Sequence, residues 1–218
     1  MNTNVINNFL SIREYIKKNC LDNEIIKIIA VSKTFGEEKI LPLLKNGNIH
    51  FGENKVQEAE VKWISLKQRF PNARLHMIGR LQSNKAKKAI QLFDFIHSLD
   101  NQKLADVLSN LENNNGKRIK YFIQVNLGSE DQKAGIQANV LDDFYTYCVK
   151  EKKLDVIGLM AIPPNDGNQE IHFKYLRDAT LSLGLKELSM GMSGDYKIAI
   201  KYKSTFLRIG SSIFGNRT

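Results

Sequence analysis

Short apolar runs and longer amphipathic segments alternate along the chain. Residues 25–33 (IIKIIAVSK) form the first run, and a run so rich in β-branched residues predicts a buried strand. In a later segment, apolar residues recur at intervals of three and four, which is the spacing of one face of a helix. Those residues are Val56, Ala59, Trp63, Leu66 and Phe70. The two periodicities distinguish predicted strands from predicted helices.

Eight strands are predicted in this way, with a helical segment between each consecutive pair. They cover residues 25–33, 49–53, 73–79, 94–100, 118–128, 154–162, 185–191 and 204–210. Strands that alternate with helices are typical of parallel βαβ construction, so the fold class is α/β. We expect a single (β/α)8 TIM barrel and a single domain over residues 1–218. An extra N-terminal helix precedes it, with Val5, Phe9, Ile12 and Ile16 on its apolar face.

An open, doubly wound sheet is the alternative topology. No GxGxxG motif follows the first strand, which weakens the dinucleotide-binding version of that fold. Periodicity alone does not decide between the closed barrel and the open sheet.

The composition is that of an ordinary globular protein. Of the 218 residues, 42% are hydrophobic and 25% are charged, which is enough for a sizeable core. No stretch approaches the roughly 18 apolar residues of a membrane span, and the N-terminus lacks the pattern of a secretory signal. Cys20 and Cys148 form no CxxC pattern and are expected to be reduced. We therefore expect a cytoplasmic protein without a membrane partner.

The formal net charge of +9 raises the question of a nucleic-acid partner. The lysines are scattered, with only small clusters such as Lys85, Lys87 and Lys88. No aromatic-interleaved basic stripe or zinc-finger pattern accompanies them. This pattern favours a solvated basic surface over a nucleic-acid interface, although charges scattered in sequence can gather in space. The positive charge also favours anionic ligands.

The first candidate for chemistry is Lys33, at the end of the first predicted strand. In a barrel, ligands bind at the C-terminal ends of the strands, so this lysine is expected at the barrel mouth. One interpretation is a solvated residue that simply follows the strand. The other is a nucleophile, because desolvation lowers the pKa of a lysine and frees its amine to attack an aldehyde.

Two loops rich in glycine and serine provide a second candidate feature. Ser193–Gly194 precedes a predicted helix, and Gly210, Ser211 and Ser212 follow the last strand. Backbone N–H groups at such places bind phosphate, and barrels often build phosphate sites after strands seven and eight. The alternative is that both loops are ordinary turns.

Arg208 alternates with Leu207 and Ile209 on the last predicted strand. If these two neighbours face the helices, Arg208 faces the barrel interior, where its guanidinium needs an acceptor. A carboxylate or an aromatic ring nitrogen of a cofactor could supply one. A lysine for an aldehyde, an arginine for a ring nitrogen and two loops for a phosphate together describe pyridoxal phosphate.

A family resemblance runs from about residue 25 to the C-terminus. Seven blocks carry it: AVSKTFG, HFGENKVQEA, HMIGRLQSNK, VNLGSEDQKAGI, GLMAIPP, LSMGMSGDYKIAI and LRIGSSIFGNR. In order and spacing they resemble the pyridoxal phosphate homeostasis protein family, whose members look like the barrel half of alanine racemase. The resemblance implies a TIM barrel of the fold-type III kind that binds pyridoxal 5'-phosphate (PLP).

The resemblance also implies roles for individual residues. Lys33 is expected to hold PLP covalently as a Schiff base, and Arg208 to face the pyridine nitrogen. The other implied positions are Ser193, Gly210 and Ser211 at the phosphate, Asn54 near the ring, and Lys133 in cofactor exchange. No residue is expected to be catalytic. The four histidines, His50, His76, His97 and His172, show no metal-ligand spacing, so no metal is expected.

The expected role is PLP homeostasis, meaning buffering or delivery of the cofactor inside the cell, without robust catalytic activity. Racemases of this fold add a β domain, whereas this sequence ends at Thr218, soon after the last predicted strand. An arginine at the ring nitrogen also makes the cofactor a poorer electron sink. Apo PLP-dependent enzymes are candidate recipients, and a monomer is expected. The alternatives are a weak amino-acid racemase and a nucleic-acid-associated protein.

Overall fold

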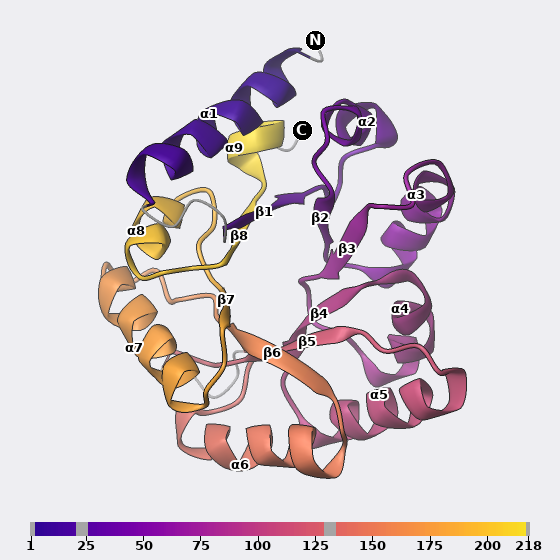
Figure 1. Cartoon of the computed structure of the whole chain (residues 1–218), viewed down its shortest axis with the longest axis vertical. Helices are drawn as coiled ribbons and strands as arrows, with labels where there is room; N and C mark the ends of the chain where they lie inside the picture. The colour runs from indigo at the N-terminus through magenta and orange to yellow at the C-terminus, as the bar shows by residue number, and fades with distance from the viewer. Residues whose placement is uncertain (1–2, 21–25, 129–133, 217–218) are drawn as a thin grey trace.

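The eight strands close into a parallel barrel (Figure 1). The computed structural model describes residues 3–20, 26–128 and 134–216. Each strand pairs in parallel with the next, and β8 pairs back onto β1. The strands are β1 (Lys27–Val31), β2 (His50–Glu53), β3 (Arg74–Met77), β4 (Phe95–Leu99), β5 (Lys120–Gln124), β6 (Asp155–Met160), β7 (Glu187–Ser189) and β8 (Phe206–Ile209). The predicted barrel is confirmed, and the open sheet is wrong.

The helices form a ring outside the strands (Figure 1). They are α1 (Thr3–Asn19), α2 (Glu37–Lys45), α3 (Val56–Arg69), α4 (Ala86–Leu92), α5 (Gln102–Asn115), α6 (Leu141–Thr146), α7 (Gln169–Ser182), α8 (Tyr196–Lys201) and α9 (Ser211–Phe214). Two 3-10 turns, η1 (Ser83–Lys85) and η2 (Ala138–Val140), precede α4 and α6, and a π-helical turn, η3 (Tyr147–Glu151), continues α6. None of the described helices combines the length and apolarity that a bilayer crossing requires.

Two apolar layers hold the barrel together. The outer layer lies between strands and helices and includes Leu207 and Ile209 of β8. The smaller inner layer fills the barrel with Ile29, Val31, Phe122, Met160 and Phe206. Because side chains of a strand alternate between its two faces, the position between Leu207 and Ile209 points into the barrel.

The extra N-terminal helix packs on the outside of the barrel. Its predicted apolar face is buried, and α1 packs against α2 and α9, as Figure 1 shows. Asn8 Nδ2 donates a hydrogen bond of 3.0 Å to the carbonyl of Ile213 in α9. The first helix of the chain is therefore tied to the short helix that follows the last strand.

Candidate cofactor site

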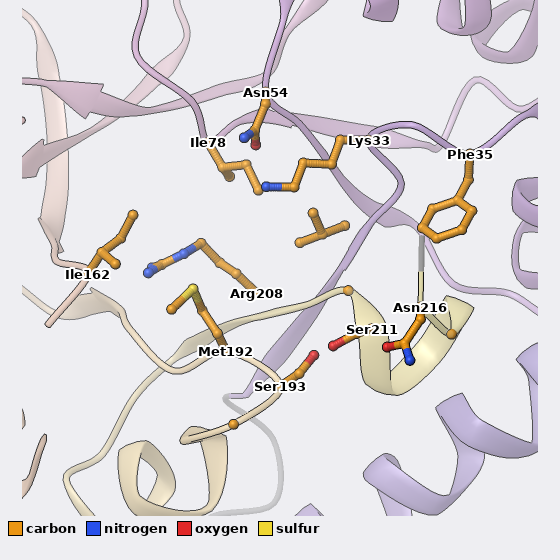
Figure 2. A pocket seen from close by; sticks show the side chains of 14 residues that line it. Lys33, Phe35, Asn54, Ile78, Ile162, Met192, Ser193, Arg208, Ser211 and Asn216 are labelled. Carbon is orange, nitrogen blue, oxygen red and sulfur yellow. The ribbon is translucent and has the colours of Figure 1, made fainter. Parts of the chain in front are cut away.

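A pocket of about 450 Å³ opens at the C-terminal end of the barrel. All six residues predicted for the cofactor line it: Lys33, Asn54, Ser193, Arg208, Gly210 and Ser211. Figure 2 shows Lys33 and Asn54 along one side, Arg208 across from them, and the hydroxyls of Ser193 and Ser211 pointing toward one another. The fold thus brings together side chains that lie far apart in the sequence.

Lys33 reaches the pocket because the chain turns sharply after β1. Ile29 and Val31 face the barrel interior, and Lys33 continues the same alternation two positions beyond the last strand residue. Thr34 then adopts a left-handed conformation with φ of 70°, and its N–H donates to Glu58 Oε1 at 2.5 Å. The loop is therefore fixed immediately next to Lys33.

A buried ion pair between Lys62 and Glu53 holds the backbone of this loop. Lys62 Nζ lies 2.7 Å from Glu53 Oε1 and donates to the carbonyls of Ser32 and Phe35 at 2.9 and 3.3 Å. The same Glu53 oxygen accepts from Ser32 Oγ and from Trp63 Nε1, at 2.7 and 3.0 Å. Burial raises the pKa of Glu53, while Lys62 and these hydrogen bonds act against that rise. Ser32, which precedes Lys33, and Thr34, which follows it, are therefore both connected by hydrogen bonds to side chains of α3.

Asn54 lies just beyond β2, and its side chain presents an acceptor with no protein donor. Its Oδ1 is buried and accepts no hydrogen bond from any residue that the structure describes. Gly79 permits this position, because a Cβ there would lie 2.4 Å from the backbone oxygen of Asn54. A buried acceptor without a partner is costly, so this oxygen is suited to a donor on a ligand.

Arg208 lies at the floor of the pocket and is 4% exposed. Its Nη1 donates to Ser189 O and Oγ, at 2.6 and 2.7 Å, and its Nη2 donates to Ala161 O at 2.8 Å. Burial lowers its pKa to about 10, which leaves it a cation at neutral pH. The inward guanidinium is thus satisfied by carbonyls and a hydroxyl, and the carboxylate that one interpretation of the sequence required is not among these partners.

The two serine loops meet at the other end of the pocket. The N–H of Ser212 donates to Ser193 Oγ at 3.1 Å, which joins the loop after β7 to the start of α9. Gly210 and Ser211 complete this rim. N–H groups and hydroxyls concentrated in this way are suited to an anionic oxygen group.

Comparison with known proteins identifies the family of this chain. The family described as alanine racemase, N-terminal domain, matches residues 4–218. A pyridoxal phosphate homeostasis protein of Pasteurella multocida is 39% identical over 202 residues, which cover 88% of this chain and 87% of the relative. Its namesake in Escherichia coli K12 is 34% identical over 203 residues, covering 89% and 87%. The chain belongs to the pyridoxal phosphate homeostasis protein family.

Solved structures agree with this family assignment. PipY of Synechococcus elongatus, in a structure with PLP bound, is 32% identical to this chain, with a TM-score of 0.87. The similarity covers 97% of this chain and all of PipY. Alanine racemase of Corynebacterium glutamicum, at 14% identity and a TM-score of 0.70, matches 61% of its own length and shows only the shared fold.

In this member of the homeostasis family, the structure also identifies pocket residues that the sequence did not predict. They are mainly apolar and line the pocket between the polar groups: Val31, Phe35, Ile78, Ile162 and Met192. Ile78 and Met192 each stand beside a glycine- or serine-containing strand end, the only signal that could have identified them. Lys133, predicted to take part in cofactor exchange, lies outside the described residues.

Proposed function

We propose that this chain binds PLP in the barrel-mouth pocket and serves in PLP homeostasis inside the cell, buffering or delivering the cofactor. The observation that carries the proposal is the meeting of Lys33, Arg208 and the two serine loops in one pocket. These groups complement an aldehyde, a pyridine nitrogen and a phosphate. The family membership and the PLP-bound relative support it.

The polar and apolar groups that line the pocket are complementary to the groups of PLP. The ring of PLP carries a hydroxyl, and the buried Oδ1 of Asn54 is an acceptor without a protein donor among the described residues. Ser193, Gly210 and Ser211 would hold the phosphate, and Arg208 would face the ring nitrogen. Ile78, Ile162 and Met192 would supply apolar contacts to the ring.

Lys33 would hold the cofactor covalently as a Schiff base. Its amine would be the nucleophile, and the aldehyde of the cofactor would supply the electrophilic carbon. The loop that carries Lys33 is fixed by Glu53, Glu58 and Lys62, so the backbone of this lysine is positioned before the cofactor arrives.

A carrier role, without robust catalysis, agrees best with Arg208. A guanidinium is a donor that does not give up its proton at neutral pH, so it favours an unprotonated ring nitrogen. An unprotonated ring withdraws electrons less strongly and supports carbanion chemistry less well. The recipients would be apo PLP-dependent enzymes, and the carrier would act as a cytoplasmic monomer.

The test of binding is spectroscopic. Wild-type protein mixed with PLP should show a visible absorption band, and borohydride should bleach it and leave a reduced adduct on the peptide containing Lys33. Lys33→Ala should lose the band, whereas Lys45→Ala, a change at an exposed lysine of α2, should keep it. A Lys33→Ala spectrum identical to the wild type would contradict the proposal.

The carrier role has its own test. Amino acids incubated with the PLP-loaded protein in deuterated water should exchange their Cα proton slowly, and PLP should pass to an added apo-enzyme. Rapid Cα exchange would favour the racemase alternative.

A further inference from the structure

A row of hydrogen bonds crosses the interior of the barrel beneath the pocket. His50 Nδ1 lies 2.9 Å from His76 Nε2, and His76 Nδ1 lies 2.9 Å from His97 Nε2. His97 Nδ1 is 2.9 Å from Ser189 Oγ, which accepts from Arg208 Nη1 at 2.7 Å. We call His50, His76, His97 and Ser189 the histidine row. It ends at the arginine in the floor of the pocket.

Each histidine of the row lies about two residues closer to the C-terminal end of the barrel than the histidine on the preceding strand. His50 is the first residue of β2, and His76 is level with Gly52, two residues further along β2. His76 is in turn level with Phe95, and His97 lies two residues beyond Phe95. The stagger of neighbouring strands in a closed barrel produces these steps. The row therefore runs from the N-terminal mouth of the barrel to the pocket at the other end.

Aromatic side chains fix the rings of the row. The ring of His76 stacks on Phe95 at 4.2 Å and 8°, and His97 stacks on Phe122 at 4.2 Å and 19°. Both histidines are completely buried. Burial lowers the pKa of each well below its ordinary value, and it lowers the pKa of His50 to about 4. All three rings are therefore neutral at physiological pH, with one donor and one acceptor nitrogen each.

The arginine sets the direction of every bond in the row. A guanidinium only donates, so Ser189 Oγ accepts from Arg208. The buried hydroxyl proton of Ser189 then needs an acceptor, and among the described residues its remaining hydrogen-bond partner is His97 Nδ1, which therefore accepts it. His97 then carries its proton on Nε2 and donates to His76 Nδ1. His76 in turn donates from Nε2 to His50 Nδ1. One tautomer, with the proton on Nε2, is thereby selected for all three histidines.

A metal site does not account for the cluster. Among the described residues, no group of three or more His, Cys, Asp or Glu side chains is arranged to hold a metal ion. Both ring nitrogens of His76 and of His97 are used within the row. A packing role alone would need only apolar rings, as Phe95 and Phe122 supply beside them.

We propose that the histidine row is a set of positioning residues that orients Ser189 and, through it, the guanidinium of Arg208 toward the cofactor ring. This inference rests on the proposed function, because Arg208 is taken to face the ring nitrogen of PLP. The row locks the Ser189 hydroxyl so that its lone pair faces the arginine. It also connects cofactor binding with His50, at the opposite end of the barrel.

The first test examines the row in cofactor-free protein. Long-range 1H–15N NMR spectra of the imidazoles should show His76 and His97 neutral, with protonated Nε2 and unprotonated Nδ1. A protonated Nδ1 on either ring would overturn the direction of the row, and so the proposal. This result does not depend on PLP binding.

The second test examines the cofactor. Ser189→Ala removes the hydroxyl that joins Arg208 to His97, and it should raise the apparent Kd for PLP about tenfold and shift the visible band. Ser189→Thr should restore both values. The matched control is Ser98→Ala, because Ser98 is equally buried but its hydroxyl has no hydrogen-bond partner within the described chain.

A distal variant tests whether the effect passes along the row. His50→Leu should raise the apparent Kd about two- to threefold, while His50→Asn, whose amide oxygen replaces the acceptor Nδ1, should stay near the wild type. If Ser189→Ala and His50→Leu bind PLP like Ser98→Ala, the row has no positioning role although the carrier function stands. If the wild type itself does not bind PLP, both proposals fall.

Discussion

His50 makes the stability of the protein depend on pH. Burial, followed by the nearby charges of Lys27 and Arg74, lowers its pKa from 6.5 to about 4, while Asp94 and Glu187 act in the opposite direction. In the unfolded chain this histidine takes up its proton near pH 6.5, whereas the folded protein resists protonation until about pH 4. The free energy of unfolding therefore decreases as the pH falls through this window.

Urea unfolding at a series of pH values tests this expectation. His50 alone should contribute a loss of up to about 3 kcal/mol between pH 6.5 and pH 4, and the two deeper histidines should add to it. His50→Asn should give a shallower dependence than the wild type. Equal slopes for the two proteins would show that His50 titrates normally.

The buried pair of Lys62 and Glu53 should be costly to break. Lys62→Met leaves the carboxylate of Glu53, which is fully buried, without its cation, and it should lower the free energy of unfolding by about 3 kcal/mol. Lys62→Met combined with Glu53→Gln should recover part of that loss. The control is Lys88→Met, which breaks a more exposed pair with Glu60 and should cost less than about 1 kcal/mol. Equal losses in the two single variants would contradict this assignment.

At the residue scale, the sequence predicted the direction of a side chain wherever one strand alone determines it. Alternation along β8 and position at the end of β1 were enough to turn Arg208 inward and to place Lys33 at the mouth. The partners of these residues were not predictable, because they come from other strands. The acceptors of Arg208 lie on β7 and beyond β6, and the histidine row depends on a stagger that the linear sequence does not display.

At the scale of elements, α1 should affect the cofactor although it does not line the pocket. Asn8 donates a hydrogen bond to the carbonyl of Ile213 in α9, and α9 carries Ser211, which is proposed to hold the phosphate. Asn8→Ala should raise the apparent Kd for PLP about two- to fivefold, because α9 loses one hydrogen bond to its support. Titration of the visible band measures it, with Asn7→Ala, on the exposed face of the same helix, as the control. Similar values for both variants would show that α9 needs no support from α1.

The order of the elements was predictable, but several boundaries were not. The predicted strand at 25–33 ends at Val31, and the chain then turns at Thr34, which has a left-handed conformation. The helical segment expected between the fifth and sixth strands is α6, which η2 precedes and the π-helical η3 continues. The glycine- and serine-rich segment predicted to be a loop after the last strand is helical from Ser211, where α9 begins. Such details depend on local backbone geometry, which hydrophobic periodicity does not encode.

At the scale of the whole molecule, the net charge of +9 should favour the capture of an anionic cofactor. The association rate of PLP should fall by roughly threefold or more between low salt and about 0.5 M salt, because ions screen this attraction. Stopped-flow absorbance measures the rate, and pyridoxal, which lacks the phosphate, is the matched control. An equal salt effect on both compounds would show that the phosphate is not what the charge attracts.

The pairing of β1 with β8 has a consequence for how the protein folds. Ile29 of β1 lies opposite Arg208 of β8, so the strand that precedes Lys33 and the strand that carries Arg208 meet only where the barrel closes. Contacts between segments so distant in sequence form slowly, because a long loop must be closed first. During refolding with PLP present, the visible colour should therefore return in the slowest phase and report ring closure of the barrel.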